Sequence, residues 1–596
     1  MGGQIVSGTG QIGSANAQAL TVTQSSPKMI VDWASFNVGA GSTVTFVQPG
    51  SSSVALNRVT GPDPSTIQGS IRANGQVFLV NPNGVYFTPG SQISVGALVA
   101  STLKISNEDF NSGRYRFEGN STAQLINEGS ITATGDGTNS GAAYFIAARV
   151  INRGSIDAPH GKVGLASGRK VMLDIGAPVP LQIDESAIDG LIEQSGIIKA
   201  DGGQIMITSK AASALHASVI NQTGTLQATS LGIGQNGEII LSAGENGTAN
   251  ISGTLNVSSP DNQAGRVEVT AQKITIKDGA RIDATGQTGG GTVLIGGDWQ
   301  GSGATQQAKT VSVEPDVEID ASAKSLGDGG KVVVWSDIRD PKSITSVSGS
   351  LKSEGGSIQG NGGMIETSGH ALQVDGIRIS TQAPNGKTGL WLLDPYNIEI
   401  GSGGTTGTTG TYTATADNSV VNVGALQSAL ATSNVTVSTG SSGSQDGDIT
   451  VTSPINIPSS KILTLAASGG VSGSAGISIG SGSSLVINQS GTSTYAGIIS
   501  GTGSLVKQGA GTLTLSQSNT YSGGTTVALG TLSFTQRTGL GTGLVTLNES
   551  NTIGDVRLLA EYNVPATLSD ALNTSIENAI TVAPKVSTSG LTTIET

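Results

Sequence analysis

The chain contains no cysteine among its 596 residues, and only 3% of its residues are aromatic. The absence of cysteine excludes a disulfide framework, a thiol nucleophile and any cysteine-ligated metal. No apolar run approaches the ~20 residues that a membrane helix needs. Met1–Gln4 has neither the basic start nor the apolar segment of a signal peptide. We therefore expect either a cytosolic protein or a chain whose leader is absent.

Charge is also scarce, because only 12% of the residues are charged. The 42 acidic and 30 basic residues give a formal net charge of −12. This balance disfavours nonspecific binding to nucleic acid or to an anionic membrane. We expect a soluble surface protein with no nucleic-acid partner.

Glycine is abundant, with 88 residues, and 36% of the chain is hydrophobic. Residues 3–60 alternate apolar and polar side chains at period two, which predicts strands. From about residue 120, short β-type runs recur behind a glycine, at Gly129, Gly154, Gly196, Gly224, Gly253, Gly279 and Gly376. Steps in the twenties with glycine turns are typical of a parallel β-helix. Disorder is the competing explanation of the composition, but regular alternation favours a folded core.

One step of this repeat is longer, which indicates an insertion over about Lys170–Asp189. Asn127, Asn152 and Asn221 lie at near-equivalent repeat positions, so we expect them to stack as an amide ladder inside successive coils. Residues 28–36 gather large side chains, and we expect this cluster to cap the first coil. Glycine-rich tracts at 289–291, 401–410 and 438–444 predict loops, since no helix follows them to bind a phosphate.

The run Val77–Phe87 is apolar and is broken once, by Asn81-Pro82-Asn83-Gly84. Proline presets φ at the second position of a turn, asparagine bonds back to the backbone, and glycine accepts a positive φ. The run predicts a strand, a tight turn and a second strand.

Residues 2 to about 250 resemble the secretion domain of two-partner-secretion exoproteins, the family of the filamentous haemagglutinins and high-molecular-weight adhesins. The resemblance rests on Gly2–Val6, Met29–Trp33 with Phe36-Asn37, Val54–Val59, Asn74–Val85 and Leu98–Leu103. It implies an all-β, right-handed parallel β-helix with an N-terminal cap and extra-helical β-hairpins. The family's secretion and folding motifs fall on Asn57, Arg58, Val59, Asn81, Pro82, Asn83 and Gly84. A further family motif, Asn-Pro-Asn-Leu, has no literal copy.

Later motifs look like the stem of the high-molecular-weight adhesins: Gly296–Gly301, Gly330–Asp337, Gly363–His370 and Trp391–Asn397. Gly503–Val527 resembles the autotransporter passenger-associated repeat. We predict a secretion domain at 1–250, a β-helical stem at 251–400, a Gly/Ser/Thr-rich joint at 401–450 and a second β-helical segment at 451–596. The last residues stop within the pattern, so we expect the N-terminal part of a longer protein.

Possible catalytic groups are few. The acidic candidates are Asp184, Glu185, Asp189, Glu193 and the Asp283/Asp320 pair, and we interpret them as solvated surface acids. His160, His216 and His370 lie far apart and show no metal-ligand spacing. Trp299, Trp335 and Trp391 are either sugar-stacking platforms or, by our preferred interpretation, packing residues. We expect no enzyme activity, no cofactor and no metal.

The resemblance implies a secreted or cell-surface adhesin that passes through the periplasm and is exported by an outer-membrane transporter of the Omp85 superfamily. A host or neighbouring-cell receptor or glycan would be its second partner, and we expect a monomer. The alternatives are the stalk of a contact-dependent toxin, a polysaccharide-degrading β-helix enzyme and a haem-acquisition exoprotein.

Overall fold

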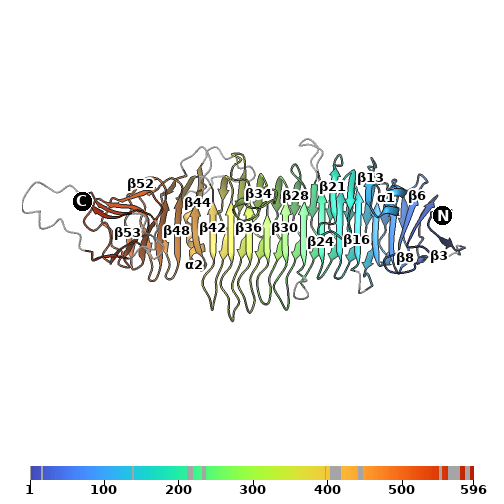
Figure 1. The fold of residues 1–596 in the computed structure, drawn as a ribbon, viewed down its shortest axis with the longest axis horizontal. Coiled ribbons are helices and arrows are strands. Elements are labelled where there is room, and N and C mark those ends of the chain that lie inside the picture. Colours follow the sequence, from blue (N-terminus) through green and yellow to red (C-terminus); the bar gives the residue numbers. More distant parts are fainter. Residues whose placement is uncertain are drawn as a thin grey trace, which may run out of the picture. The chain divides into compact units, whose positions relative to one another are not determined.

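The computed structural model describes residues 2–14, 16, 18–136, 140–210, 219–230, 236–395, 397–402, 418–439, 447–548, 554–561, 578–583 and 591–595. By their contacts these residues form two compact units. Figure 1 labels strands and helices of both. The first holds Met1–Gly297, Gly303–Ala308 and Ser312–Lys331, and the second holds Asp298–Ser302, Lys309–Val311 and Val332–Thr596. These units are defined by contacts within the fold, so they do not test the four domain boundaries predicted from the sequence, which remain predictions.

The first unit is a parallel β-helix whose coils each contribute strands to three ladders. The first ladder contains β4 (Lys28–Trp33), β6 (Val54–Val59), β9 (Gln76–Val80), β12 (Ala97–Ser101), β16 (Ala142–Ala147), β19 (Lys162–Ser167), β24 (Gln204–Ser209), β27 (Glu238–Ser242), β30 (Arg266–Thr270) and β33 (Thr292–Ile295). The predicted all-β solenoid is confirmed.

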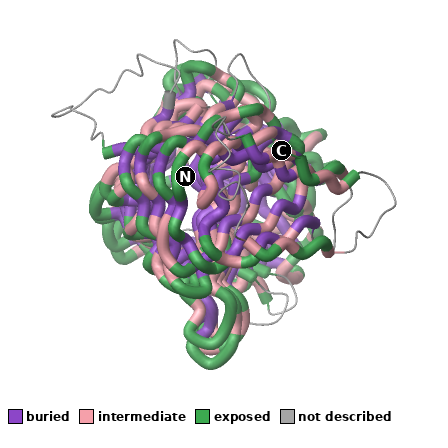
Figure 2. The backbone as a smooth tube through the Cα atoms, turned by 90° about the vertical axis from the view of Figure 1, so that its left-hand side faces the viewer, coloured by how far each residue is buried: buried purple, intermediate pink, exposed green. Residues whose placement is uncertain are grey.

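The second ladder of this unit contains β7 (Ser65–Ile67), β10 (Val85–Phe87), β14 (Gln124–Asn127), β17 (Arg149–Asn152), β22 (Leu191–Gln194), β25 (Val219–Gln222), β28 (Thr248–Ile251) and β31 (Lys273–Ile276). The third contains β3 (Ala19–Gln24), β5 (Thr43–Val47), β8 (Ser70–Ala73), β11 (Gln92–Val95), β15 (Ser130–Ala133), β18 (Ser155–Asp157), β23 (Ile197–Lys199), β26 (Thr225–Gln227), β29 (Thr254–Asn256), β32 (Arg281–Asp283) and β35 (Glu318–Asp320). Buried residues line the inside of the coils and exposed residues lie at the turns (Figure 2).

The first coil is capped by residues that precede the predicted cluster. β1 (Gly3–Ser7) pairs antiparallel with β4, and β2 (Gly10–Ile12) pairs antiparallel with β3. The expectation that residues 28–36 form the cap is therefore wrong: Lys28–Trp33 is the first strand of the parallel ladder itself. Antiparallel pairing covers the edge that this strand would otherwise expose.

The predicted insertion is an extra-helical β-sheet. β20 (Lys170–Leu173) forms a hairpin with β21 (Leu181–Glu185), and β13 (Tyr115–Glu118) pairs with β20 on the other side. The short helix α1 (Asn107–Ser112) precedes β13, with Ser106 accepting the Asp109 amide at its N-terminus. Phe110 of α1 and Phe117 of β13 are fully buried against Phe78 of β9, so this sheet packs on the outer face of the first ladder.

The second unit repeats the three-ladder arrangement. Its first ladder contains β36 (Lys331–Trp335), β39 (Met364–Ser368), β42 (Leu390–Asp394), β45 (Asn434–Ser438), β48 (Ile462–Ala467), β51 (Ser484–Gln489), β54 (Ser504–Gln508), β56 (Thr525–Val527), β58 (Val545–Leu547) and β60 (Ile580–Val582). Its second contains β37 (Ile344–Val347), β40 (Ala371–Gln373), β43 (Asn397–Gly401), β44 (Asn418–Asn422), β46 (Ile449–Val451), β49 (Val471–Gly473), β52 (Thr492–Tyr495), β55 (Thr512–Leu515), β57 (Gly530–Phe534), β59 (Val556–Ala560) and β61 (Thr592–Glu595). β34 (Thr310–Val313) carries residues of both units, and so does β36, whose first residue, Lys331, belongs to the first unit.

A helix interrupts the third ladder of the second unit. β38 (Ser350–Lys352) and β41 (Arg378–Ser380) pair on one side of it, and β47 (Ile455–Ile457), β50 (Ile477–Ile479) and β53 (Ile499–Gly501) pair on the other. α2 (Val423–Thr432) contacts both β41 and β47, and Asn422 caps its N-terminus. This helix lies within the predicted joint, of which residues 403–417 and 440–446 fall outside the described part.

Columns of glycine let successive coils approach through their backbones. A Cβ atom on Gly154, Gly196, Gly224 or Gly253 would lie 2.0–2.2 Å from the carbonyl oxygen of the glycine one coil earlier. Five of the seven predicted repeat glycines therefore form one column, which begins at Gly129. Gly376 does not belong to it, because it faces open space at φ +76°. Gly279 does not belong to it, because Gly279 faces open space in a turn at φ +83° and Ala280 takes the stacked position.

The predicted amide ladder is confirmed for two of its three members. Asn127 Nδ2 donates to Asn152 Oδ1 over 2.7 Å, and Asn152 Nδ2 donates to Gln194 Oε1 over 2.6 Å. All three side chains are fully buried. The prediction for Asn221 is wrong. Asn221 pairs with Glu193, whose side chain faces outward, and Gln222 takes the inward position beside Gln194. A shift of one residue moves a strand side chain to the other face.

Adding a methyl group to the glycine column should destabilise the first unit. We expect Gly196→Ala to lower the free energy of unfolding by about 1–3 kcal/mol, because its Cβ would lie 2.0 Å from the Gly154 carbonyl oxygen. Gly50→Ala is the matched control, since its Cβ meets nothing within 4 Å. Urea unfolding of the purified chain checks this, and equal midpoints for the two variants would contradict it.

Candidate functional site at the N-terminal groove

Asn81-Pro82-Asn83-Gly84 forms the predicted tight turn, at a corner between β9 and β10. The Gly84 amide donates to the Asn81 carbonyl over 3.1 Å, and the Asn83 amide donates to Asn81 Oδ1 over 2.9 Å. Gly84 has φ +122°, which favours glycine. β9 and β10 belong to different ladders, so the turn bends one coil and does not close a hairpin.

The turn is bonded to the corner of the preceding coil. Asn81 Nδ2 donates to the Asp63 carbonyl and to Ser65 Oγ, each over 3.0 Å. Asn83 Nδ2 donates to the Gly61 carbonyl over 2.8 Å. Asn81 is fully buried. Both asparagine side chains therefore join one coil to the next.

Asn57-Arg58-Val59 ends β6, and its first two side chains point to opposite faces. Asn57 is fully buried and accepts a 3.0 Å hydrogen bond from Trp33 Nε1. Arg58 faces outward and forms a bidentate pair with Asp32 at 2.8 and 3.0 Å. Its remaining nitrogen donates to Asn107 Oδ1 of α1 over 2.9 Å. The motif thus joins the first coils to α1.

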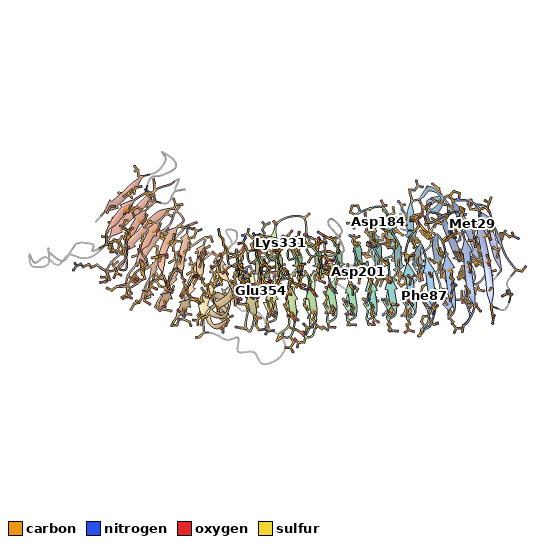
Figure 3. All side chains as sticks on the ribbon, turned by 90° about the horizontal axis from the view of Figure 1, so that it is seen from below. Met29, Phe87, Asp184, Asp201, Lys331 and Glu354 are labelled. Carbon is orange, nitrogen blue, oxygen red and sulfur yellow. The ribbon has the colours of Figure 1, made fainter. Side chains whose placement is uncertain are left out.

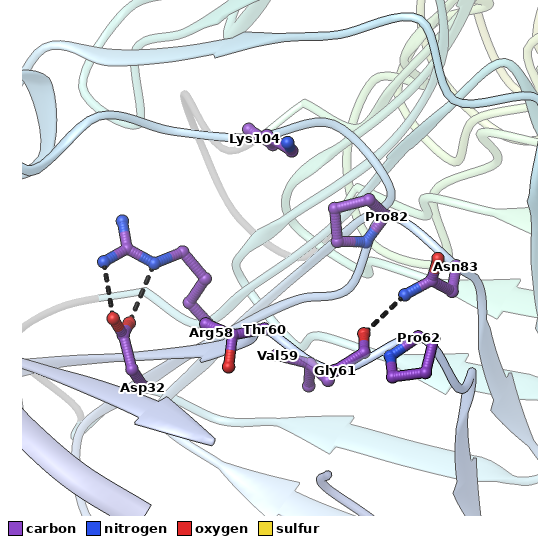
Figure 4. A pocket seen from close by; sticks show the side chains of 9 residues that line it. All are labelled: Asp32, Arg58, Val59, Thr60, Gly61, Pro62, Pro82, Asn83 and Lys104. Atoms are coloured by element: carbon purple, nitrogen blue, oxygen red, sulfur yellow. Dashed lines mark hydrogen bonds and ion pairs between the residues drawn. The ribbon is translucent and has the colours of Figure 1, made fainter. Parts of the chain in front are cut away.

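The two motifs meet at one groove of about 680 Å³ (Figure 4). The lining residues are Asp32, Arg58, Val59, Thr60, Gly61, Pro62, Pro82, Asn83 and Lys104. Of the seven predicted residues, four line the groove; Asn57 and Asn81 are buried, and Gly84 completes the turn. Two prolines and a bonded turn give the groove a fixed shape, which suits binding of a polypeptide segment.

Sequence reasoning missed Asp32 and Lys104 as parts of this site. Asp32 lies inside the quoted motif Met29–Trp33, and Lys104 directly follows Leu98–Leu103. Lys104 is exposed, and its backbone bonds to Glu118 of β13. The sequence signal that could have identified both residues is their position inside or next to these motifs.

The other acidic candidates do not form a catalytic pair among the described residues. Asp184 and Glu185 lie on the extra-helical hairpin, with Asp184 at the edge of the molecule (Figure 3) and Glu185 3.6 Å from Lys170. Glu193 lies 3.8 Å from Arg153, and Asp189 stands at φ +54°. Asp283 and Asp320 are neighbours in register, but Asp283 accepts bonds from Thr285 and Asp320 from Ser322.

Two of the three histidines and all three candidate tryptophans lie in the described part of the chain, and Trp299 is half-buried. His160 is exposed, His370 Nδ1 lies 3.1 Å from the Ile338 carbonyl, and His216 falls outside the described residues. No group of three His, Cys, Asp or Glu residues in that part could hold a metal ion. Trp335 and Trp391 are buried, so neither offers a ring face to a sugar. No helix among the described residues is long and apolar enough to cross a membrane.

Comparison with protein families finds two matches. A family described as TPS secretion domain matches residues 4–257, which contain the groove. A family described as Passenger-associated-transport-repeat matches residues 505–534.

Comparison with individual proteins agrees. The crystal structure of the HMW1 secretion domain from Haemophilus influenzae is 31% identical, with a TM-score of 0.57, and the match covers 66% of this chain and 99% of that chain. Two proteins named heme/hemopexin-binding protein, both from Haemophilus influenzae, are 31% and 30% identical over 48% and 46% of this chain. The match spans about a third of their length (32%).

Truncating Asn81 should destabilise the corner that builds the groove. Asn81→Ala leaves buried Ser65 Oγ and the Asn83 amide without their partners, so we expect a loss of about 1–3 kcal/mol in unfolding free energy. Asn107→Ala removes one exposed bond to Arg58 and should cost less than about 0.5 kcal/mol. Urea midpoints measure both, and an Asn81→Ala midpoint equal to that of Asn107→Ala would refute the structural role.

Proposed function

This chain belongs to the two-partner-secretion exoproteins, and on that premise we propose that its N-terminal unit directs export and starts folding while the later coils serve adhesion. Proteins of this family are secreted or surface-exposed. The convergence of Asn57-Arg58-Val59 and Asn81–Gly84 at one groove carries the proposal. The partner at that groove is an outer-membrane transporter of the Omp85 superfamily.

The cap and the corner bonds support a role in starting the fold. β1 and β2 cover the first coil, so its outer edge needs no further partner. Each later coil then pairs with the one before it, and nearest-neighbour stacking lets a solenoid grow from one end. Near the start of that growth, Asn81 and Asn83 bond the corner that follows β9 to the corner that follows β6 in the preceding coil.

Adhesion to a host or neighbouring cell is the leading role of the later coils, with no enzymatic step. The support is the resemblance of the stem motifs to the high-molecular-weight adhesins and the absence of a paired acid and base among the described residues. A toxin stalk and a polysaccharide-degrading enzyme are weaker alternatives.

Binding of haem or hemopexin is a second candidate function. The relatives that share 30–31% identity carry the name heme/hemopexin-binding protein. The described histidines, His160 and His370, lie 210 residues apart in the sequence and belong to different units, so capture of the carrier protein is favoured over direct haem ligation.

Export tests the groove. We expect Lys104→Ala to leave stability unchanged, because its exposed side chain forms no hydrogen bond or ion pair with the described residues, and to lower secretion through the cognate transporter several-fold. Lys199→Ala on β23, outside the groove, is the control. Asn83→Ala reports on the turn itself. Immunoblots of culture supernatants measure secretion, and full export of both Lys104→Ala and Asn83→Ala would reject the groove as a recognition surface.

Binding assays separate the two candidate roles. We expect the purified chain to bind cultured epithelial cells in a saturable manner and to capture no hemopexin in a pull-down. Bovine albumin is the control ligand. Saturable capture of hemopexin without cell binding would replace adhesion by the haem-acquisition role.

A further inference from the structure

Three stem motifs that the proposed function leaves unused meet in the second unit. Gly296–Gly301 supplies Asp298 and Gln300, Gly363–His370 supplies Glu366, and Trp391–Asn397 supplies Asp394. Glu366 lies on β39 and Asp394 on the neighbouring β42, where Ser368 and Asp394 are paired in register. Asp298–Ser302 belongs to the same unit. We call residues 298–302 the strap.

The Glu366 side chain points out of the coil, yet it is buried. Its neighbour Thr367 faces inward, where Thr367 Oγ1 accepts a 3.0 Å bond from Trp391 Nε1. Because side chains alternate along a strand, Glu366 points to the outer face. It is nevertheless 0% exposed, and the Gln300 backbone amide donates to Glu366 Oε2 over 2.8 Å. The strap therefore lies over this carboxyl group.

The strap is held in an unusual conformation by short-range bonds. Gln300 has φ +51°, a region that non-glycine residues rarely occupy. Asp298 accepts the Trp299 amide over 2.7 Å, and the Gly301 amide donates to the Asp298 carbonyl over 2.9 Å. Left-handed backbone at a non-glycine residue persists only where surrounding contacts compensate for it. The bond to Glu366 is such a contact.

The two charged side chains that act on the pKa of Glu366 are both acidic. Burial raises the pKa of Glu366 to about 8, the bonds from Gln300 and Ser368 oppose that rise, and Asp394 and Asp298 add to it. Burial also raises the pKa of Asp394, whose Oδ1 has no hydrogen-bond partner among the described residues. On β36 the charged residue is Lys331, at the start of the strand.

We propose that Glu366, Asp394 and the strap form a proton-dependent clasp that closes over the outer face of β39 and opens as the carboxyl group ionises. When the strap opens, water reaches Glu366 and its pKa returns toward the ordinary value. The closed state then binds the proton more tightly than the open state. Closure is complete at low pH, weakens as the pH rises from the ordinary carboxyl pKa toward 8, and changes little above 8.

Hydrogen exchange followed by mass spectrometry tests the clasp on the full chain. After correction for intrinsic exchange rates, the opening equilibrium of the strap peptide should rise about fifty-fold between pH 6 and pH 8, and about twofold more above pH 8. Glu366→Gln, which cannot ionise, should abolish this dependence. Glu245→Gln, at an exposed carboxyl group of the first unit, should behave as the wild type. Equal pH profiles for wild type and Glu366→Gln would overturn the proposal.

A second measurement needs no change at Glu366. Trp299 is half-buried within the strap, whereas Trp33, Trp335 and Trp391 are fully buried. Acrylamide quenches tryptophan fluorescence. Subtracting the quenching of Trp299→Phe from that of the wild type leaves the contribution of Trp299. We expect this difference to increase between pH 6 and pH 9, and a constant difference would overturn the clasp even if Glu366→Gln failed to fold.

Discussion

Close backbone contact between successive coils is the constraint on which the rest of the structure depends. A parallel ladder requires each coil to lie on the previous one at strand spacing, including at the turns. In the column from Gly129 to Gly253, a side chain would occupy the space of the preceding carbonyl oxygen. The same demand limits aromatic residues, because a narrow core leaves little room for rings. One group of aromatic side chains packs outside the first ladder, where α1 and β13 widen the first unit, around Phe78, Phe110 and Phe117.

Stacking also decides how buried polar groups are satisfied. Inside a solenoid, a polar side chain finds its partner one coil away, as Asn127 does with Asn152, and Asn57 with Trp33. Asn519 extends this rule over three coils, accepting from the Ile499 amide and donating to the Gly539 carbonyl. Lys507 is buried too, and its ammonium group donates to the carbonyls of Gln508, Gly509 and Leu529. Burial lowers the pKa of Lys507 to about 8. Such residues fix the register between coils, because a slip would leave them unpaired.

The ends and corners carry the family-specific features. The antiparallel cap ends the ladder on one side, and the groove forms where Arg58 and Asn83 leave two successive coils. Under the proposed function, recognition and folding use the same bonds, so we expect variants that break the turn to affect both. Exposed Lys104 offers a contact that folding does not require. In the second unit the strap likewise lies outside the ladder, and it covers part of a strand that would otherwise face water.

The sequence by itself determined the β-helical class, the glycine column, the insertion at 170–189 and the turn at Asn81–Gly84, because each depends on local periodicity or turn chemistry. It misplaced Asn221, Gly279 and the cap, since each requires a register or a pairing partner exact to one residue. Only the tertiary structure decided that Arg58 bonds Asp32, that two motifs share one groove with Lys104, and that Glu366 lies beneath the strap. The physical reason is that stacking brings together residues that are one or more coils apart in the sequence. The number of residues in a coil changes with each insertion, so the sequence does not reveal which residues meet.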